Sequence, residues 1–188
     1  DKILRLETAT KILSSGLVAH TSALLFLITA GFIGAFFTGV ETEKAIIVFA
    51  AILGGYMALN IGANDVANNV GPAVGSKAMS IFAALLMAAV FESAGALLAG
   101  GDVVSTISKG IIDPELVPNN KMFINAMMAA LMAAAVWVNL ATVLGAPVST
   151  THAVVGGVMG AGIAAVGFQL VNWNMMAAIA ASWVISPI

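Results

Sequence analysis

The sequence predicts an all-α, polytopic transmembrane helical bundle in which helices are broken or re-entrant at two places. Of its 188 residues, 61% are apolar and only 9% are charged, and the mean hydropathy is +1.05. An ordinary soluble domain is about 45–50% apolar and about 25% charged, so this chain could not cover a water-facing surface without large apolar patches. At about 20 residues per helical span, the chain has room for roughly six spans.

The same composition argues against several other classes of protein. A net charge of −2 provides no basic surface for a phosphate backbone, so no nucleic-acid partner is expected. The chain has no cysteine, which excludes a disulfide framework and a Cys nucleophile within it. We find no paired carboxylates, metal-binding histidine cluster or nucleophile triad in the sequence. We therefore expect neither an enzyme nor a bound cofactor.

The first two spans follow an amphiphilic beginning. Residues 1–21 mix charged and apolar side chains, which is typical of a helix at the membrane surface or of a short solvated lead-in. Residues 22–40 and 45–61 are apolar runs separated by a short charged turn, and this arrangement argues against a cleaved signal peptide. The basic residues before the first span favour a cytoplasmic N-terminus. They are Lys2, Arg5 and Lys11.

The rest of the chain continues the predicted transmembrane domain, which we place at residues 22–188. We predict further spans at residues 78–99, 122–144 and 152–168, and a sixth from residue 174 onward. Residues 100–121 are the longest polar stretch and form the main predicted loop outside the membrane. The sixth run is short for a span, and the sequence does not begin with Met, so we expect part of a longer membrane protein.

Two polar stretches interrupt the apolar runs, at residues 62–77 and 145–152. A backbone amide without a partner in hydrocarbon costs several kcal/mol, so irregular backbone at membrane depth is tolerated only beside protein or a water-filled cavity. Broken helices of this kind form the substrate sites of many transporters. We therefore expect the chemistry of the protein at these two stretches.

The first interruption carries oxygen ligands. Asn60, Asn64 and Asn68 are spaced by four residues and would share one face of a helix, with Asp65 and Asn69 beside them. Carboxamide and carboxylate oxygens suit a small hard cation. The alternative is a polar turn between two spans. This alternative explains an ionisable residue such as Asp65 less well, because acids within membrane segments are usually functional.

The second interruption carries hydrogen-bond donors. Pro147 suits the first turn of a helix, and Ser149, Thr150 and Thr151 supply three consecutive hydroxyls at the start of the following helix. A helix N-terminus carries partial positive charge and unpaired N–H groups, which favours an anion. Plain N-capping is the alternative, although a cap needs only one hydroxyl. His152 is expected to form a hydrogen bond rather than to take part in chemistry.

The two interruptions together predict coupling between a cation and an anion. Two negative charges 4 Å apart at an effective dielectric constant of about 20 repel by about 4 kcal/mol. A mobile cation held by Asp65 and the asparagine oxygens would cancel this repulsion, and binding of the anion would then depend on binding of the cation. Protonation of Asp65 would have the same effect, so a proton is the alternative coupling ion.

Four short segments resemble the inorganic phosphate transporter (PiT) family. They are GANDVAN at residues 62–68, PVSTTH at 147–152, FESAG at 91–95 and SKGIID at 108–113. The resemblance implies a phosphate symporter coupled to sodium, or to protons in some members, built from two inverted repeats and often dimeric. It implies that Asn64, Asp65 and Asn68 contribute to the cation and phosphate sites. It also implies that Ser149, Thr150 and Thr151 contact phosphate.

The family carries both signatures twice, and this chain carries each once, so the resemblance implies one of two repeats. Such a protein would reside in the cell membrane and work by alternating access. Transport of another oxyanion such as sulfate, an ion channel and a membrane assembly subunit remain as alternatives. Glu92 is a possible additional ion ligand, expected to face the bundle interior. Gly156 and Gly160 are expected to pack helices together.

Overall fold

The computed structural model describes residues 2–38 and 44–185, with side chains from residue 16 onward. The described residues are helical apart from short connections and one isolated antiparallel bridge between Ile112 and Val171. The chain divides into two compact units, residues 1–59 and residues 60–188, which are treated separately below. The all-helical fold that the sequence predicts is confirmed.

The first unit is a helical hairpin of α1 (Lys2–Phe37) and the part of α2 (Lys44–Ile61) that ends at Leu59. The two helices approach closely at small residues, since a Cβ at Gly34 would lie 2.9 Å from the Cβ of Ala51. Residues 2–21, predicted as an amphiphilic lead-in, are helical and continue without interruption into the first predicted span. This stretch has no proline and therefore no strong helix breaker.

The second unit begins where α2 enters the first polar interruption. The helix does not break there. It widens into a π-helical turn at Gly62–Val66 and continues as α3 (Ala67–Gly75), so one helical run extends over Lys44–Gly75. A π-turn is an i→i+5 turn, which is often found at functional sites. The polar residues 62–75 therefore lie on a distorted helix.

Helix α4 (Ile81–Ser105) packs against α3 and starts with Ser80, whose side chain accepts a hydrogen bond from the Ala83 N–H. A second π-helical turn at Thr106–Gly110 prolongs it. The loop predicted at residues 100–121 is thus mostly helix at its start, and the irregular part is confined to residues 111–119, with a 3-10 turn at Pro114–Leu116. The polar side chains at the end of α4, such as Asp102 and Ser105, are exposed, and exposed polar side chains are compatible with a helix.

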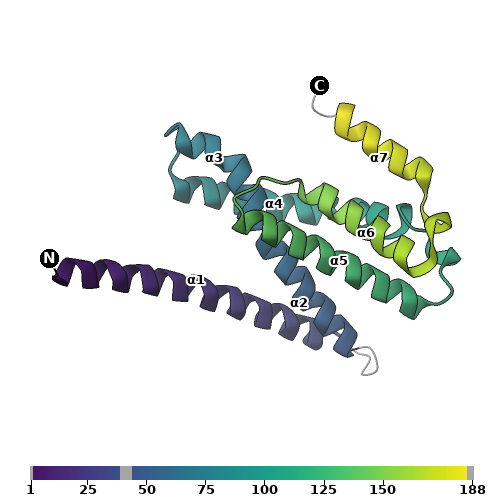
Figure 1. Ribbon diagram of the computed structural model, residues 1–188, viewed down its shortest axis with the longest axis horizontal. Helices are drawn as coiled ribbons and strands as arrows, with labels where there is room; N and C mark the ends of the chain where they lie inside the picture. Colours follow the sequence, from purple (N-terminus) through teal and green to yellow (C-terminus); the bar gives the residue numbers. More distant parts are fainter. Residues whose placement is uncertain (1, 39–43, 186–188) are drawn as a thin grey trace. The chain divides into compact units, whose positions relative to one another are not determined.

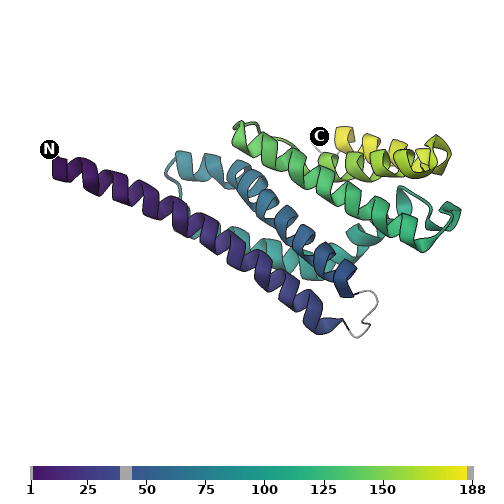
Figure 2. The same cartoon turned by 60° about the horizontal axis from the view of Figure 1, so that its bottom comes forward.

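The remaining helices are α5 (Asn120–Val143), α6 (Thr150–Val166) and α7 (Trp173–Ile185), with a 3-10 turn at Phe168–Leu170. Helices α5 and α6 lie side by side and form the most extensive helix pair in the unit (Figures 1 and 2). The buried face of α5 consists almost entirely of small residues, which lets α6 come close. It comprises Ala126, Ala130, Ala134, Ala135, Val138 and Ala141.

Within the part of the chain that the structure describes, four helical runs are long and apolar enough to cross a membrane: Gly16–Phe37, Lys44–Gly75, Ile81–Gly110 and Asn120–Val143. The fifth and sixth predicted spans correspond to α6 and α7, which have 17 and 13 residues. At 1.5 Å per residue these helices are about 26 Å and about 20 Å long, less than the hydrocarbon core of about 30 Å. The structure therefore supports four full spans and two shorter apolar helices.

The glycines that meet a neighbouring helix are not the predicted ones. A Cβ at Gly156 or Gly160 would have nothing within 4 Å among the described residues, whereas a Cβ at Gly157 would lie 2.7 Å from the Ala130 carbonyl oxygen on α5. The GxxxG pattern does not indicate which side of α6 faces α5. Gly157 is therefore the glycine at which α6 approaches the backbone of α5.

Replacing Gly157 with alanine should destabilise the protein by about 2 kcal/mol, because the added methyl group meets a backbone oxygen that cannot turn aside. Thermal unfolding in detergent should show a lower Tm. Gly160→Ala on the same helix is the matched control, since alanine favours a helix by about 1 kcal/mol and meets open space there. Equal Tm values for the two variants would contradict the close approach of α5 and α6.

Candidate functional site

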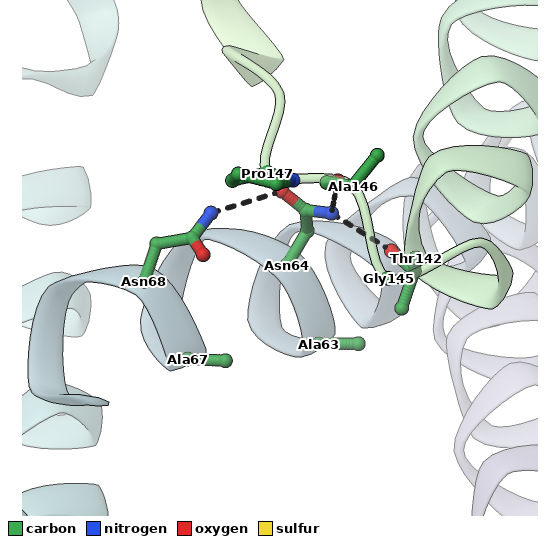
Figure 3. Close-up of a pocket in the computed structure, with 8 residues that line it drawn as sticks. All are labelled: Ala63, Asn64, Ala67, Asn68, Thr142, Gly145, Ala146 and Pro147. Atoms are coloured by element: carbon green, nitrogen blue, oxygen red, sulfur yellow. Dashed lines mark hydrogen bonds between the residues drawn. The ribbon is translucent and has the colours of Figure 1, made fainter. Parts of the chain in front are cut away.

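The two polar interruptions meet in the second unit, and Asn64 joins them. Asn64 lies in the π-turn and is only 6% exposed. Its Nδ2 donates to Thr142 Oγ1 at 3.1 Å and to the Ala146 carbonyl oxygen at 3.2 Å. Its Oδ1 accepts from Asn68 Nδ2 at 3.2 Å and from the Val148 N–H at 3.3 Å. Figure 3 shows Asn64 and Asn68 both reaching toward the segment between α5 and α6.

These four hydrogen bonds use the whole capacity of a carboxamide, which has two N–H donors and two oxygen lone pairs. They also fix the orientation of the Asn64 amide, because the Val148 N–H can donate only to the oxygen. The segment from Gly145 to Ser149 has irregular backbone, and Asn64 satisfies two of its polar groups. In this structure Asn64 holds the segment in place.

Asp65, the next residue, contacts the start of α6. Its Oδ2 accepts a hydrogen bond from Thr150 Oγ1 at 2.8 Å. Thr150 is 7% exposed and Asp65 is half-buried. Thr150 is the first residue of α6, so the carboxylate lies at a helix N-terminus, where the helix dipole stabilises negative charge. The acid and the three-hydroxyl stretch are thus in direct contact.

The three consecutive hydroxyls have different surroundings. Ser149 is the N-cap, and its Oγ accepts from the His152 N–H at 3.2 Å. Thr150 donates to Asp65, and Thr151 is exposed. By helix geometry the N–H groups of Thr150 and Thr151 have no partner within α6. Pro147 lies before the cap and not in the first helical turn as expected, because the irregular segment extends to Ser149.

A small cavity of about 150 Å³ adjoins Asn64 and Asn68 on one side and the segment between α5 and α6 on the other. Its lining residues are Ala63, Asn64, Ala67, Asn68, Thr142, Gly145, Ala146 and Pro147 (Figure 3). The cavity combines amide, hydroxyl and backbone groups with small apolar side chains. It is large enough for a small ion with some of its water.

Two polar residues of α5 that lie outside both polar stretches also support the site. Asn139 Nδ2 donates to Asn60 Oδ1 at 2.9 Å, and Thr142 accepts from Asn64 while donating to the Val138 carbonyl oxygen at 2.8 Å. Asn60 is 4% exposed. An asparagine and a threonine three residues apart within an otherwise apolar span are the signal that could have revealed them.

Glu92 does not join this group. It lies exposed on α4 and lines a separate cavity of about 340 Å³, together with Asn69 of α3 and Phe91. Among the described helices Glu92 is therefore exposed at the edge of the contact between α3 and α4 and does not face the interior of the bundle.

Comparison with known proteins identifies the family. The model of the phosphate transporter family matches residues 61–188, which include both polar stretches and every residue in contact at the site except Asn60. The chain belongs to the phosphate transporter family. A relative from Helicobacter pylori described as a phosphate permease is 52% identical over 186 residues, covering 99% of this chain and 35% of that protein. One from Pyrococcus abyssi is 43% identical over 142 residues, covering 76% of this chain and 35% of that protein.

A solved structure supports the same assignment. A protein described as the sodium-dependent phosphate transporter matches with a TM-score of 0.73 and 46% identity, covering 77% of this chain and 36% of that one. The chain thus spans about a third of the length of these relatives. Membership of the family and four membrane-capable runs make this phosphate transporter family chain an integral membrane protein.

Proposed function

We propose that this chain forms one repeat of a secondary transporter that carries inorganic phosphate across the cell membrane together with sodium. The hydrogen bond between Asp65 and Thr150 is the observation that carries the proposal, because it joins a candidate cation ligand to a candidate anion site. The similarity to a protein described as sodium-dependent favours sodium over a proton as the coupling ion.

The proposed cation site consists of Asp65 with the side-chain oxygens of Asn64 and Asn68. Sodium prefers oxygen ligands of this kind, and the carboxylate supplies the countercharge. Asn64 already has four protein partners, so it would give up one of them to bind an ion directly. We therefore assign Asn64 mainly the task of holding the segment between α5 and α6, and Asp65 the main electrostatic role.

The proposed phosphate site is the start of α6, with Ser149, Thr150 and Thr151 as donors, and Asn68 at the rim of the adjoining cavity. Without a cation, Asp65 accepts a hydrogen bond from the Thr150 hydroxyl and repels an approaching anion. Sodium at Asp65 would cancel that repulsion, worth about 4 kcal/mol at 4 Å and an effective dielectric constant of about 20. Thr150 would then be free to donate to phosphate, so sodium would bind first.

Alternating access would move the loaded site between the two sides of the membrane. We propose that a second, inverted repeat of the same transporter supplies the remaining ligands, and that the transporter forms a homodimer. The family signatures, each present once here, favour this arrangement. Glu92 stays a candidate additional ion ligand, whose neighbours would come from outside the described helices.

Uptake of labelled phosphate tests the proposal. The full-length natural protein, reconstituted in liposomes, should accumulate phosphate against its gradient when sodium is high outside, and not when potassium replaces sodium. Accumulation driven by a proton gradient alone would establish the proton as the coupling ion. Flux that only follows the phosphate gradient would indicate a channel. Competition by excess sulfate would identify the alternative oxyanion, which has a similar tetrahedral shape.

Replacing Thr150 and Thr151 together with alanine should raise the KM for phosphate about 100-fold, since two hydrogen bonds to a charged group are lost. Thr29→Ala is the matched control, because this threonine of α1 donates only within its own helix, to the Leu25 carbonyl oxygen at 2.8 Å. Kinetics of phosphate uptake at saturating sodium measure the effect. An unchanged KM in the double variant would place the phosphate elsewhere.

A further inference from the structure

We infer that His152 is a positioning residue that sets the direction in which the Ser149 hydroxyl donates its proton. The inference rests on the proposed phosphate site at the start of α6. Its basis is a short contact of 2.6 Å between His152 Nδ1 and Ser149 Oγ. The proposed transport cycle does not otherwise involve the His152 ring.

The ring contact is more than helix capping requires. The backbone N–H of His152 already donates to Ser149 Oγ at 3.2 Å, and this is the usual N-cap bond. The imidazole adds a second bond from the same residue to the same oxygen. The Ser149 hydroxyl therefore has both the backbone and the ring of His152 as partners, and the position of one proton decides what it can still do.

A serine hydroxyl has one proton and two lone pairs, and a neutral imidazole carries its proton on one of its two nitrogens. With the proton on Nε2, Nδ1 accepts, and the Ser149 proton points at the ring. With the proton on Nδ1, the ring donates, both Ser149 lone pairs are filled, and the hydroxyl proton must point to another acceptor. Only this second arrangement allows Ser149 to donate to a phosphate oxygen.

Helix α7 fixes the plane of the imidazole. The rings of His152 and Trp183 stack, with centroids 3.6 Å apart and planes inclined by 30°. Trp183 is half-buried and packs against the core between α5 and α6. A half-turn of the imidazole about its bond to the Cβ would replace Nδ1 with a carbon atom and leave the ring in the same plane. The contact with Ser149 therefore selects Nδ1, while the stack limits the other rotations of the ring.

Two substitutions separate the nitrogen from the stacked ring. His152→Phe keeps an aromatic ring beside Trp183 but removes Nδ1, whereas His152→Asn keeps an amide close to the position of Nδ1 and removes the ring. In phosphate uptake by the full-length natural protein at saturating sodium, His152→Phe should raise the KM severalfold with little change in Vmax, because the Ser149 hydroxyl remains but no ring nitrogen directs its proton toward the phosphate. His152→Asn should stay close to the wild type.

A matched control is His20→Phe. The Nδ1 of His20 also makes a 2.6 Å contact, to the Gly16 carbonyl oxygen within α1, so the same chemical change is made far along the chain from the site. In a Ser149→Ala background, His152→Phe should cause no further rise in KM, because the hydroxyl on which it acts is gone.

Equal KM values for the Phe and Asn variants, whether both raised or both normal, would overturn the inference. A further rise in the Ser149→Ala background would do the same. If His152→Phe does not reach the membrane, His152→Gln replaces it, because the glutamine amide lies nearer the position of Nε2 than that of Nδ1. A KM that is raised for His152→Gln but not for His152→Asn would then support the inference. Equal KM values for these two variants would refute it. If the wild-type protein takes up no phosphate, both the proposed function and this inference are refuted. If the wild type takes up phosphate and His152→Phe has an unchanged KM, only the inference is refuted.

Discussion

Replacing Asp65 with asparagine should abolish the stimulation of phosphate uptake by sodium. Asparagine has nearly the same shape and can still accept the hydrogen bond from Thr150, but it lacks the charge that would hold the cation. A unit charge 4 Å from a cation at an effective dielectric constant of about 20 contributes about 4 kcal/mol, which corresponds to an affinity for sodium about 1,000-fold lower. Initial rates of phosphate uptake across a series of sodium concentrations measure the loss.

The control for this substitution is Asp102→Asn, the same change at an exposed position of α4 that lines a different cavity. Both variants should keep the Tm of the wild type, which shows that the fold is intact. A normal sodium dependence in Asp65→Asn would refute the coupling scheme, even if the uptake rate were reduced. A reduced sodium dependence in Asp102→Asn would show that the effect is not specific to the contact with α6.

Replacing Asn64 with alanine should cause the largest loss of stability, about 3–5 kcal/mol. Four hydrogen bonds of a nearly buried amide are lost, and the Ala146 carbonyl and the Val148 N–H are left without this partner. The segment between α5 and α6 should loosen as a result. Thermal unfolding measures the first effect, and faster hydrogen exchange at residues 145–149 measures the second.

Asn69→Ala is the comparison variant, because this asparagine lies on the same helical run but is exposed and lines the cavity beside α4. It should change neither the Tm nor the exchange rates at residues 145–149. If Asn64→Ala behaved in the same way as Asn69→Ala, the amide would not hold the segment, and its assignment as a direct ligand of the transported ions would gain support.

The meeting of the two polar stretches could be predicted from the sequence. An acid such as Asp65 in an apolar segment must find polar partners, and the hydroxyls of Ser149, Thr150 and Thr151 form the second concentration of such groups. Only composition and segment lengths were needed for that conclusion. The spans at residues 45–61 and 122–144 were located in the same way and agree with α2 and α5 within a few residues.

The shape of the first stretch could not be predicted. A π-turn at Gly62–Val66 differs from an α-helix by a single residue, and no apolar periodicity marks it in a segment made of small and polar side chains. The spacing of Asn64 and Asn68 suggested ligands, whereas the structure gives Asn64 four protein partners. Partners far along the chain, such as Thr142 and Val148, decide this, and spacing carries no information about them.

The packing of α6 illustrates the same limit. Gly156, Gly157 and Gly160 follow one another closely, and the pattern alone favoured the pair spaced by four. Which glycine is needed depends on the rotation of α6 relative to α5, and that rotation is set by the alanines of α5. The stack of Trp183 on His152 is a contact between α7 and α6 that no local pattern indicates.

The bonds of Asn64 and Asp65 to residues 142–150 also bear on how a transport cycle could bend this protein. The bonds of Asn64 fasten the end of α5 and the segment before α6 to the π-turn, so these parts would move as one piece even when the bond between Asp65 and Thr150 opens to admit sodium and phosphate. Hinges for any rocking motion would then lie outside this fastened piece. The two polar stretches would then keep their mutual geometry during the movement, as the proposed coupling between cation and anion requires.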